Sequence, residues 1–252
     1  MSRTAPFGFG EGLRWIGAGF SLIWRRPLLW LLLTTLLFAV AVLASMLPSV
    51  GNLLLYTLSP GILATLLLVC HQLAGDAPPV LDQVAEVLRR SAGALLTLGL
   101  AYTAIQLGLL FLLATASPEV MQAISPDKNA LPVTPAPGPD ALPVLLLVLA
   151  LSVPATMLMW FSPALIVFRR MGTWPAMRYS LAACLYHWRA CLTNGFAVFL
   201  LLLLASLPAM LGLLVWVPLM IGTLYSAYVA IFGDPGGPEL ADAEAEPGES
   251  LS

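Results

Sequence analysis

Charged residues are scarce in this chain. Only 11 Lys or Arg and 13 Asp or Glu occur among 252 residues, about 10%, whereas a soluble domain has roughly 25%. Three cysteines are too few for a disulfide scaffold, 60% apolar content is too high for disorder, and a net charge of −2 does not suit a nucleic-acid binder. The composition therefore indicates a protein that spans a membrane several times.

Four long stretches contain no charged residue. They are residues 27–75, 91–118, 141–168 and 190–233, with lengths of 49, 28, 28 and 44. A helix needs about 20 apolar residues to cross a bilayer, so each longer stretch must fold back once, near Pro48 and near Pro208. We predict six spans: 27–47, 53–74, 92–116, 143–168, 191–208 and 212–232.

The spans are expected to be helices in an all-α bundle. Their residues lack the period-two alternation of transmembrane barrel strands, and a helix satisfies its own backbone groups in lipid. The first apolar run is too long for a signal peptide, and Arg25 and Arg26 lie far from Met1. The first span is therefore expected to stay in the mature protein.

The basic residues predict the orientation of these spans. Ten of the eleven fall in segments on one side of the predicted topology, and Lys128 alone falls on the other. Because basic loops stay in the cytoplasm, both termini are predicted to be cytoplasmic. Residues 118–142 form a proline-rich external loop, and the acidic tail 234–252 is expected to be a disordered cytoplasmic segment after a single membrane domain, 1–233.

Short amphipathic segments precede three pairs of spans. Arg14 stands ten residues before Trp24-Arg25, and Arg178 stands ten residues before Trp188-Arg189. In the first segment the apolar side is expected to comprise Leu13, Ile16, Phe20 and Ile23. A third segment begins at Asp76-Ala77-Pro78-Pro79 and contains an i, i+4 ion pair of Glu86 with Arg90. We predict three cytoplasmic interfacial helices, one before each hairpin.

A proline recurs in the second helix of each hairpin. Pro60, Pro163 and Pro218 lie inside predicted spans, where proline kinks a helix and frees a carbonyl. The chain is therefore expected to comprise three parallel internal repeats, at about 8–75, 76–168 and 174–233. Inverted repeats are more typical of transporters, so this pattern favours other classes.

Three segments in order resemble a known family. Trp24-Arg25-Arg26-Pro27, Trp160-Phe161-Ser162-Pro163-Ala164-Leu165 and Tyr186-His187-Trp188-Arg189 resemble an uncharacterised family of six-helix proteobacterial inner-membrane proteins. More distantly, the pattern resembles the membrane domain of some glycerophosphodiester phosphodiesterases. The resemblance implies a bacterial inner-membrane location and this fold. The catalytic barrel of the phosphodiesterases is missing, so their activity is not implied.

Metal binding and catalysis have little support in the sequence. Cys184, His187 and Cys191 share a helical face and could ligate a soft metal, but the alternative is packing, and no Cys-x-x-Cys accompanies them. A reducing compartment disfavours a disulfide. No nucleophile elbow, zinc-protease motif or phosphate loop is present. We predict no enzyme activity, no cofactor and no metal.

The spans lack the ionisable residues that mark coupled transport. Gln106 is the most costly polar side chain to bury, and it is either an interhelical hydrogen-bond partner or a substrate ligand. Passage of a neutral or amphipathic solute stays open. Gly222, Ser226 and Ala230 form a small-residue stripe that allows close helix contact, either within the bundle or with a homo-oligomeric or other membrane-protein partner.

Arginine and tryptophan at the cytoplasmic ends of the spans are the best functional clue. Each arginine gains about 1 kcal/mol beside anionic lipid, although the same residues also serve simple anchoring. We predict a non-enzymatic inner-membrane protein with a structural or lipid-interacting role, and a permease for a neutral or amphipathic solute is the alternative. The candidate lipid-interface residues are Arg25, Arg26, Arg89, Arg90, Arg169, Arg170, Arg178, Arg189, Trp24 and Trp188.

Overall fold

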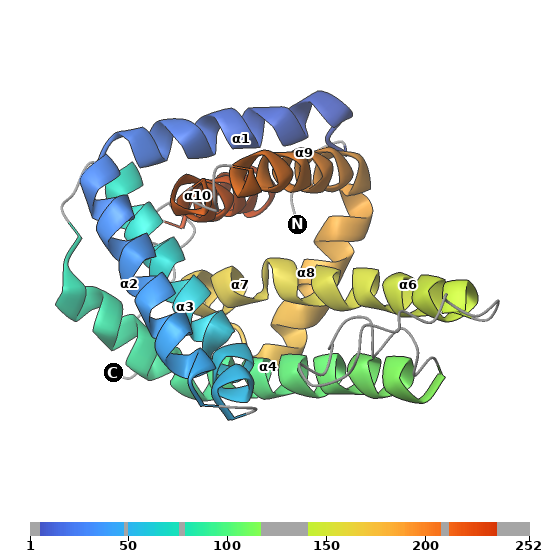
Figure 1. Cartoon of the computed structure of the whole chain (residues 1–252). Helices are drawn as coiled ribbons and strands as arrows, with labels where there is room; N and C mark the ends of the chain where they lie inside the picture. Colours follow the sequence, from blue (N-terminus) through green and yellow to red (C-terminus); the bar gives the residue numbers. More distant parts are fainter. Residues whose placement is uncertain (1–5, 48–49, 76–78, 117–140, 208–211, 236–252) are drawn as a thin grey trace, which may run out of the picture.

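A computed structural model gives the arrangement of the helices (Figure 1). It describes residues 6–47, 50–75, 79–116, 141–207 and 212–235, and within these residues it contains nine helices and no strand. The helices are α1 (Phe9–Trp24), α2 (Pro27–Ser45), α3 (Val50–Ala74), α4 (Leu81–Ala116), α6 (Ala141–Trp160), α7 (Ser162–Arg169), α8 (Thr173–Tyr186), α9 (Trp188–Ser206) and α10 (Leu213–Phe232).

Six segments of the described chain are long and apolar enough to cross a membrane, which confirms the predicted number. They are Pro27–Ser45, Leu53–Ala74, Leu81–Thr115, Leu142–Arg169, Trp188–Ser206 and Leu213–Phe232. The helices α2, α6 and α9 expose most of their leucines, whereas α10 is half buried. An apolar surface of this extent would be unstable in water but is compatible with lipid. The chain is therefore a multi-pass membrane protein.

The fourth of these segments is interrupted after Trp160. Pro163 lacks an N–H and its ring collides with the carbonyl four residues earlier, so α6 ends and α7 begins with Pro163 in its first turn. The hydroxyl of Ser180, from α8, occupies the break. It accepts a hydrogen bond from the Phe161 N–H at 3.0 Å and donates one to the Met157 carbonyl at 2.6 Å. One buried hydroxyl thus bridges the two backbone groups that an unbroken helix would have paired.

The short helix α7 lies at the centre of the protein. Every residue from Ser162 to Phe168 is buried, and the helix packs against α3, α4, α6 and α8. Aromatic rings join it to α10, because Phe168 contacts Tyr228 at a centroid distance of 5.2 Å. Figure 1 shows α7 as the short coil that continues from α6. The break at Pro163 thus produces the most buried helix of the fold.

Helix α1 packs along α9 and α10 through glycine. A Cβ atom on Gly19 would lie 2.5 Å from the backbone nitrogen of Thr223, and one on Gly222 would lie 2.9 Å from the Gly19 carbonyl oxygen. Gly12 has the same role against the backbone of Ala190 and Asn194. These glycines allow direct backbone contact between helices. The structure therefore uses Gly222 inside the bundle, which was one of the two predicted uses of the small-residue stripe.

The buried face of α1 differs from the predicted apolar side. Trp15, Leu22 and Ile23 are buried together with Gly12 and Gly19, whereas Leu13 and Phe20 are exposed. The prediction from the polar and apolar pattern was wrong because that pattern ignores glycine. In α1 the glycines determine which face approaches α9 and α10 most closely. The exposed face of α1 is also apolar, because it carries Leu13 and Phe20.

The second predicted interfacial helix is not a separate element. Residues 81–116 form one continuous helix of 36 residues, α4, so the segment with Glu86 and Arg90 continues directly into the apolar part. No proline or glycine pair separates them after Pro79. The turns at Pro48 and Pro208, the proline-rich loop with Lys128, and nearly all of the acidic tail lie outside the described residues.

The Ser180 hydroxyl gives a direct test of how the broken segment is stabilised. In Ser180→Ala, the buried Phe161 N–H loses its partner and the Met157 carbonyl keeps only its longer contact with the Cys184 thiol, so we expect a loss of about 1–3 kcal/mol in the free energy of unfolding. Ser206→Ala is the control, because the Ser206 hydroxyl is exposed and bonds only to Leu203 of its own helix. Thermal unfolding in detergent measures both, and equal midpoints for the two variants would contradict the proposed bridging role.

A second test concerns the packing of α1. Gly19→Leu must push α1 away from Thr223, which costs about 1–3 kcal/mol or more by overpacking. In Gly17→Leu the new side chain meets open space, so stability should stay the same or rise by up to about 1 kcal/mol through helix propensity. Limited proteolysis of the N-terminal segment should accelerate only in the Gly19 variant. Equal protection of the two variants would mean that α1 is not held by this contact.

Candidate functional site

The three predicted proline elements meet around one apolar cavity. Pro60 of α3, Pro163 of α7, and Val217, which precedes Pro218 in α10, all line a cavity of about 470 Å³. We call it the proline groove. The size falls within the range of about 300–1,000 Å³ that is typical of small-molecule sites. Its other lining residues are Leu37, Leu55, Tyr56, Ser59, Ile62, Leu63, Leu66, Tyr102, Thr156, Met159, Trp160, Met220, Ile221 and Leu224.

The proline groove has a buried floor and an exposed rim. Pro60, Pro163 and Leu224 are buried, whereas Tyr56 and Thr156 are exposed. Pro60 and Leu224 lie near the middle of α3 and α10, and Thr156 and Pro163 lie on either side of the break between α6 and α7. The rim opens toward the exposed leucines of the outer helices. No charged residue lines the groove. The surroundings suit a hydrocarbon chain, because a polar ligand would lose its hydration without gaining enough hydrogen bonds.

Gln106 lies close to the proline groove but differs from its expected role. It is only half buried, and its Nε2 donates to the Tyr102 hydroxyl at 3.3 Å, which is an i, i+4 contact within α4 rather than an interhelical one. Tyr102, one turn earlier, lines the groove and packs edge-on against Tyr56 at 6.3 Å. The two tyrosines were missed, because aromatic residues inside apolar runs have no distinctive pattern.

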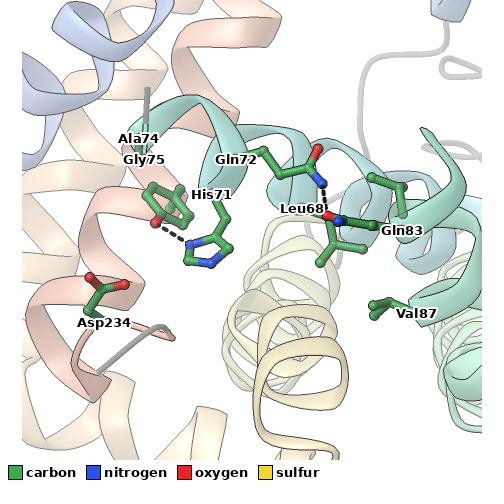
Figure 2. Close-up of a pocket in the computed structure, with 10 residues that line it drawn as sticks. Leu68, His71, Gln72, Ala74, Gly75, Gln83, Val87 and Asp234 are labelled. Atoms are coloured by element: carbon green, nitrogen blue, oxygen red, sulfur yellow. Dashed lines mark hydrogen bonds between the residues drawn. The ribbon is translucent and has the colours of Figure 1, made fainter. Parts of the chain in front are cut away.

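A second cavity lies at the ends of α3 and α10 and the start of α4 (Figure 2). We call this cavity of about 430 Å³ the end pocket. His71 Nδ1 and the Tyr225 hydroxyl are 3.0 Å apart, and Gln72 Nε2 donates to Gln83 Oε1 at 3.3 Å. Figure 2 shows the His71 ring between the Asp234 carboxylate on one side and Gln72 and Gln83 on the other. The remaining lining residues are Leu68, Ala74, Gly75, Val84 and Val87.

The walls of the end pocket are part polar and part apolar. Among the described residues that line it, Asp234 is the only charged one, and its carboxylate interacts electrostatically with both His71 and Tyr225. The C-termini of α3 and α10 also lie here, and the carbonyls at a helix C-terminus carry a partial negative charge. From the sequence, His71 was considered only as a possible soft metal ligand beside Cys70. No sequence signal pointed to the two glutamines, because their proximity depends on the angle between α3 and α4.

Two of the candidate lipid-interface arginines bond to the ends of other helices. Arg25 donates to the carbonyl of Leu73 in the last turn of α3 at 3.4 Å. Arg169, at the end of α7, donates to the carbonyl of Phe232, the last residue of α10. The last carbonyls of a helix have no partner within it, and a cation there also interacts favourably with the helix dipole. These two arginines therefore cap neighbouring helices in addition to any contact with lipid.

The other candidate residues are more exposed. Arg89 and Arg90 form ion pairs with Glu86 at 2.5 and 2.6 Å, and Arg26, Arg170 and Arg178 are exposed. Arg170 also adopts a left-handed conformation, with φ of 50°, at the C-terminus of α7.

The two candidate tryptophans each have an aromatic neighbour. Trp24 stacks on Phe20, and Arg189 lies over the rings of Phe9 and Trp188. Both tryptophans are largely exposed. Exposed aromatic and basic side chains side by side are typical of a membrane interface.

The junction of α8 and α9 contains Cys184, His187 and Cys191. Each of the first two already has a structural partner. The Cys184 thiol lies 3.8 Å from the Met157 carbonyl, and the Phe7 N–H donates to His187 Nδ1 at 3.2 Å. Within the described residues, no three His, Cys, Asp or Glu side chains converge as a metal site would require. The contacts therefore favour the packing interpretation of this cluster.

The contact of His187 with Phe7 predicts a pH dependence. Burial lowers the pKa of His187 below its ordinary value of 6.5, and protonation would turn the accepting Nδ1 into a donor. Since an unfolded or released His187 binds a proton more readily, the contact should be intact above pH 6.5. It should weaken as the pH falls from 6.5 toward the lower folded pKa.

Hydrogen exchange of the N-terminal peptide measures this effect between about pH 8 and about pH 5.5, after correction for the intrinsic rate. His187→Asn is the control, because its side-chain oxygen can accept the Phe7 N–H without titrating. The variant should lose the pH dependence. If the wild type and His187→Asn respond alike to acid, another group is responsible.

Comparison with family models, with characterised proteins and with solved structures finds no match for this chain. The resemblance to proteobacterial inner-membrane proteins stays a prediction. The functional conclusion must therefore come from the two cavities and the distribution of charge around them.

Proposed function

We propose that this protein is a non-enzymatic membrane protein that binds lipid, with the hydrocarbon tail of a lipid in the proline groove. One observation carries the proposal: three separate proline elements, from α3, α7 and α10, converge on one apolar cavity in the middle of the apolar helices. A helix bundle that only needed to be rigid would fill such a space with side chains, because cavities destabilise a fold. Lipid is the apolar molecule available at this depth.

The location and orientation form part of the same proposal. The basic residues at the start of α2, in the first part of α4, at the end of α7 and at the start of α9 suit a cytoplasmic face of a bacterial inner membrane, with both termini inside. The exposed arginines Arg26, Arg170, Arg178 and Arg189 are placed to contact anionic headgroups, while Trp24 and Trp188 suit the interface. The three-hairpin repeat, with α1 and α8 as interfacial helices, belongs to this proposal too.

A photoreactive lipid tests occupancy of the proline groove. With the full chain in nanodiscs that contain a phospholipid with a diazirine in its acyl chain, we expect preferential labelling of the peptides that carry Tyr56, Met159 and Met220. Ser59→Phe fills the groove and should reduce this labelling several-fold. Leu58→Phe, on an exposed position of the same helix that does not line the groove, should leave it unchanged.

Two labelling results would contradict lipid binding in the proline groove. If the groove peptides are labelled no more than the exposed Leu203 and Leu204 of α9, or if both variants behave like the wild type, the groove holds no lipid.

Passage of an amphipathic molecule is the second candidate function, and the presence of two cavities along the α3 and α10 pair favours it. Faster transbilayer movement of a fluorescent lipid in proteoliposomes, sensitive to Ser59→Phe, would support that candidate over static binding.

A further inference from the structure

The end pocket combines several groups that attract the same kind of ligand. Among the described lining residues, Asp234 is the one with a charge. Its carboxylate interacts electrostatically with His71 and Tyr225, which lie 3.0 Å apart through Nδ1 and the hydroxyl. Figure 2 shows Gln72 and Gln83 on the other side of the His71 ring from Asp234. Aromatic faces and a carboxylate attract a cation, and side-chain amide oxygens accept hydrogen bonds from its N–H groups. No lysine or arginine is among the described residues that line the pocket, and the Arg169 guanidinium lies outside it, close to Gly233.

We propose that the end pocket binds a primary ammonium group, as carried by the ethanolamine headgroup of a zwitterionic lipid or by a free small amine. Asp234 supplies the counter-charge. Tyr225 supplies an aromatic ring and a hydroxyl. The amide oxygens of Gln72 and Gln83 accept the Val80 N–H and the Gln72 Nε2, and each keeps one lone pair for a further hydrogen bond. The inference rests on the proposed lipid function only where the amine belongs to a lipid.

The size and position of the end pocket fit this ligand. Its volume of about 430 Å³ has room for a headgroup rather than for an ammonium group alone. Arg25 donates to Leu73, which precedes the lining residue Ala74, so a guanidinium lies near the pocket where the phosphate of a zwitterionic headgroup would follow its ammonium. The pocket lies at the ends of α3 and α10, the depth expected for a headgroup.

The hydrogen bonds inside the pocket keep its shape before a ligand arrives. The Gln72 side chain bonds at both of its ends, since its Oε1 accepts the Val80 N–H at 3.1 Å while its Nε2 donates to Gln83. Val80, which directly precedes α4, is thereby held against the last turn of α3. His71 is similarly fixed by Tyr225 and by an edge-on contact with Phe168 at 5.5 Å. A preorganised site loses less entropy on binding.

Native mass spectrometry of the full chain tests the lipid source of the amine. The protein is released from nanodiscs that contain equal amounts of phosphatidylethanolamine and phosphatidylcholine, which differ in whether the ammonium can donate hydrogen bonds. We expect preferential retention of phosphatidylethanolamine, by about tenfold if one charge-assisted hydrogen bond is decisive. Asp234→Asn should abolish the preference. Asp82→Asn, an exposed carboxylate near the pocket that does not line it, should keep it.

Free ethanolamine tests the soluble source. The chain has two histidines, His71 in the end pocket and His187 at the junction of α8 and α9, so the ring NMR signals of His71 report binding and those of His187 serve as a reference. A saturable shift of the His71 signals in phosphatidylcholine nanodiscs indicates a soluble amine as ligand. Lipid preference without this shift indicates a headgroup. Either result, if lost in Asp234→Asn, supports the ammonium site.

Two outcomes overturn the proposal. One is the absence of both a lipid preference and a shift of His71; the other is a preference that survives in Asp234→Asn. If that variant misfolds, Tyr225→Phe gives a second test, because it keeps the ring but removes the hydroxyl and should weaken the preference. This test is independent of the lipid proposal for the proline groove. If no lipid tail binds in the groove, the acyl-chain labelling of the groove is absent. If no ammonium binds in the end pocket, that labelling remains and only the preference for phosphatidylethanolamine is absent.

Discussion

The arrangement of the buried helices depends on one hydroxyl in a broken span. Pro163 prevents α6 from continuing, and the Ser180 hydroxyl pairs the two backbone groups that the break exposes. In a hydrocarbon environment, where water cannot serve, an unpaired amide or carbonyl costs several kcal/mol. The break is therefore possible only because α8 returns alongside it. Once it exists, α7 can turn into the centre, where all residues from Ser162 to Phe168 are buried.

The same requirement for backbone partners explains the placement of Arg25 and Arg169. Each donates to a carbonyl in the last turn of another helix, α3 or α10, so these ends are capped from outside their own segment. The capped ends border the end pocket, which lies between α3, α4 and α10. The prediction of membrane orientation uses these arginines only as positive charges, but in the structure they also donate hydrogen bonds to helix ends. Removal of either arginine would change the geometry of the pocket as well as the charge.

The sequence predicted the number of apolar helices because charge gaps report directly on the length of chain in the bilayer. It also predicted that proline would interrupt the helices at Pro60, Pro163 and Pro218, but of the three only Pro163 lies at a break, because Pro60 and Pro218 lie within the continuous helices α3 and α10. The difference comes from Ser180, a partner from a distant segment that no local pattern reveals. The buried face of α1 was mispredicted for a related reason: Gly12 and Gly19 have no side chain to score, and their role appears only where α9 and α10 meet them.

In the candidate sites, too, the sequence shows which residues recur, whereas only the structure shows which of them meet. Prolines recurring once per unit were visible in the sequence, but their convergence on one groove required the positions of α3, α7 and α10 to be known. In the end pocket, Gln72 at the end of α3 and Gln83 at the start of α4 lie eleven residues apart, and they meet only because these two helix ends lie close together. When polar residues are few in an apolar chain, a site is therefore recognised mainly from which of them lie close together in the structure. Along the same pair of helices, the apolar proline groove and the more polar end pocket follow one another in the order of tail and headgroup in the lipid that we propose as ligand.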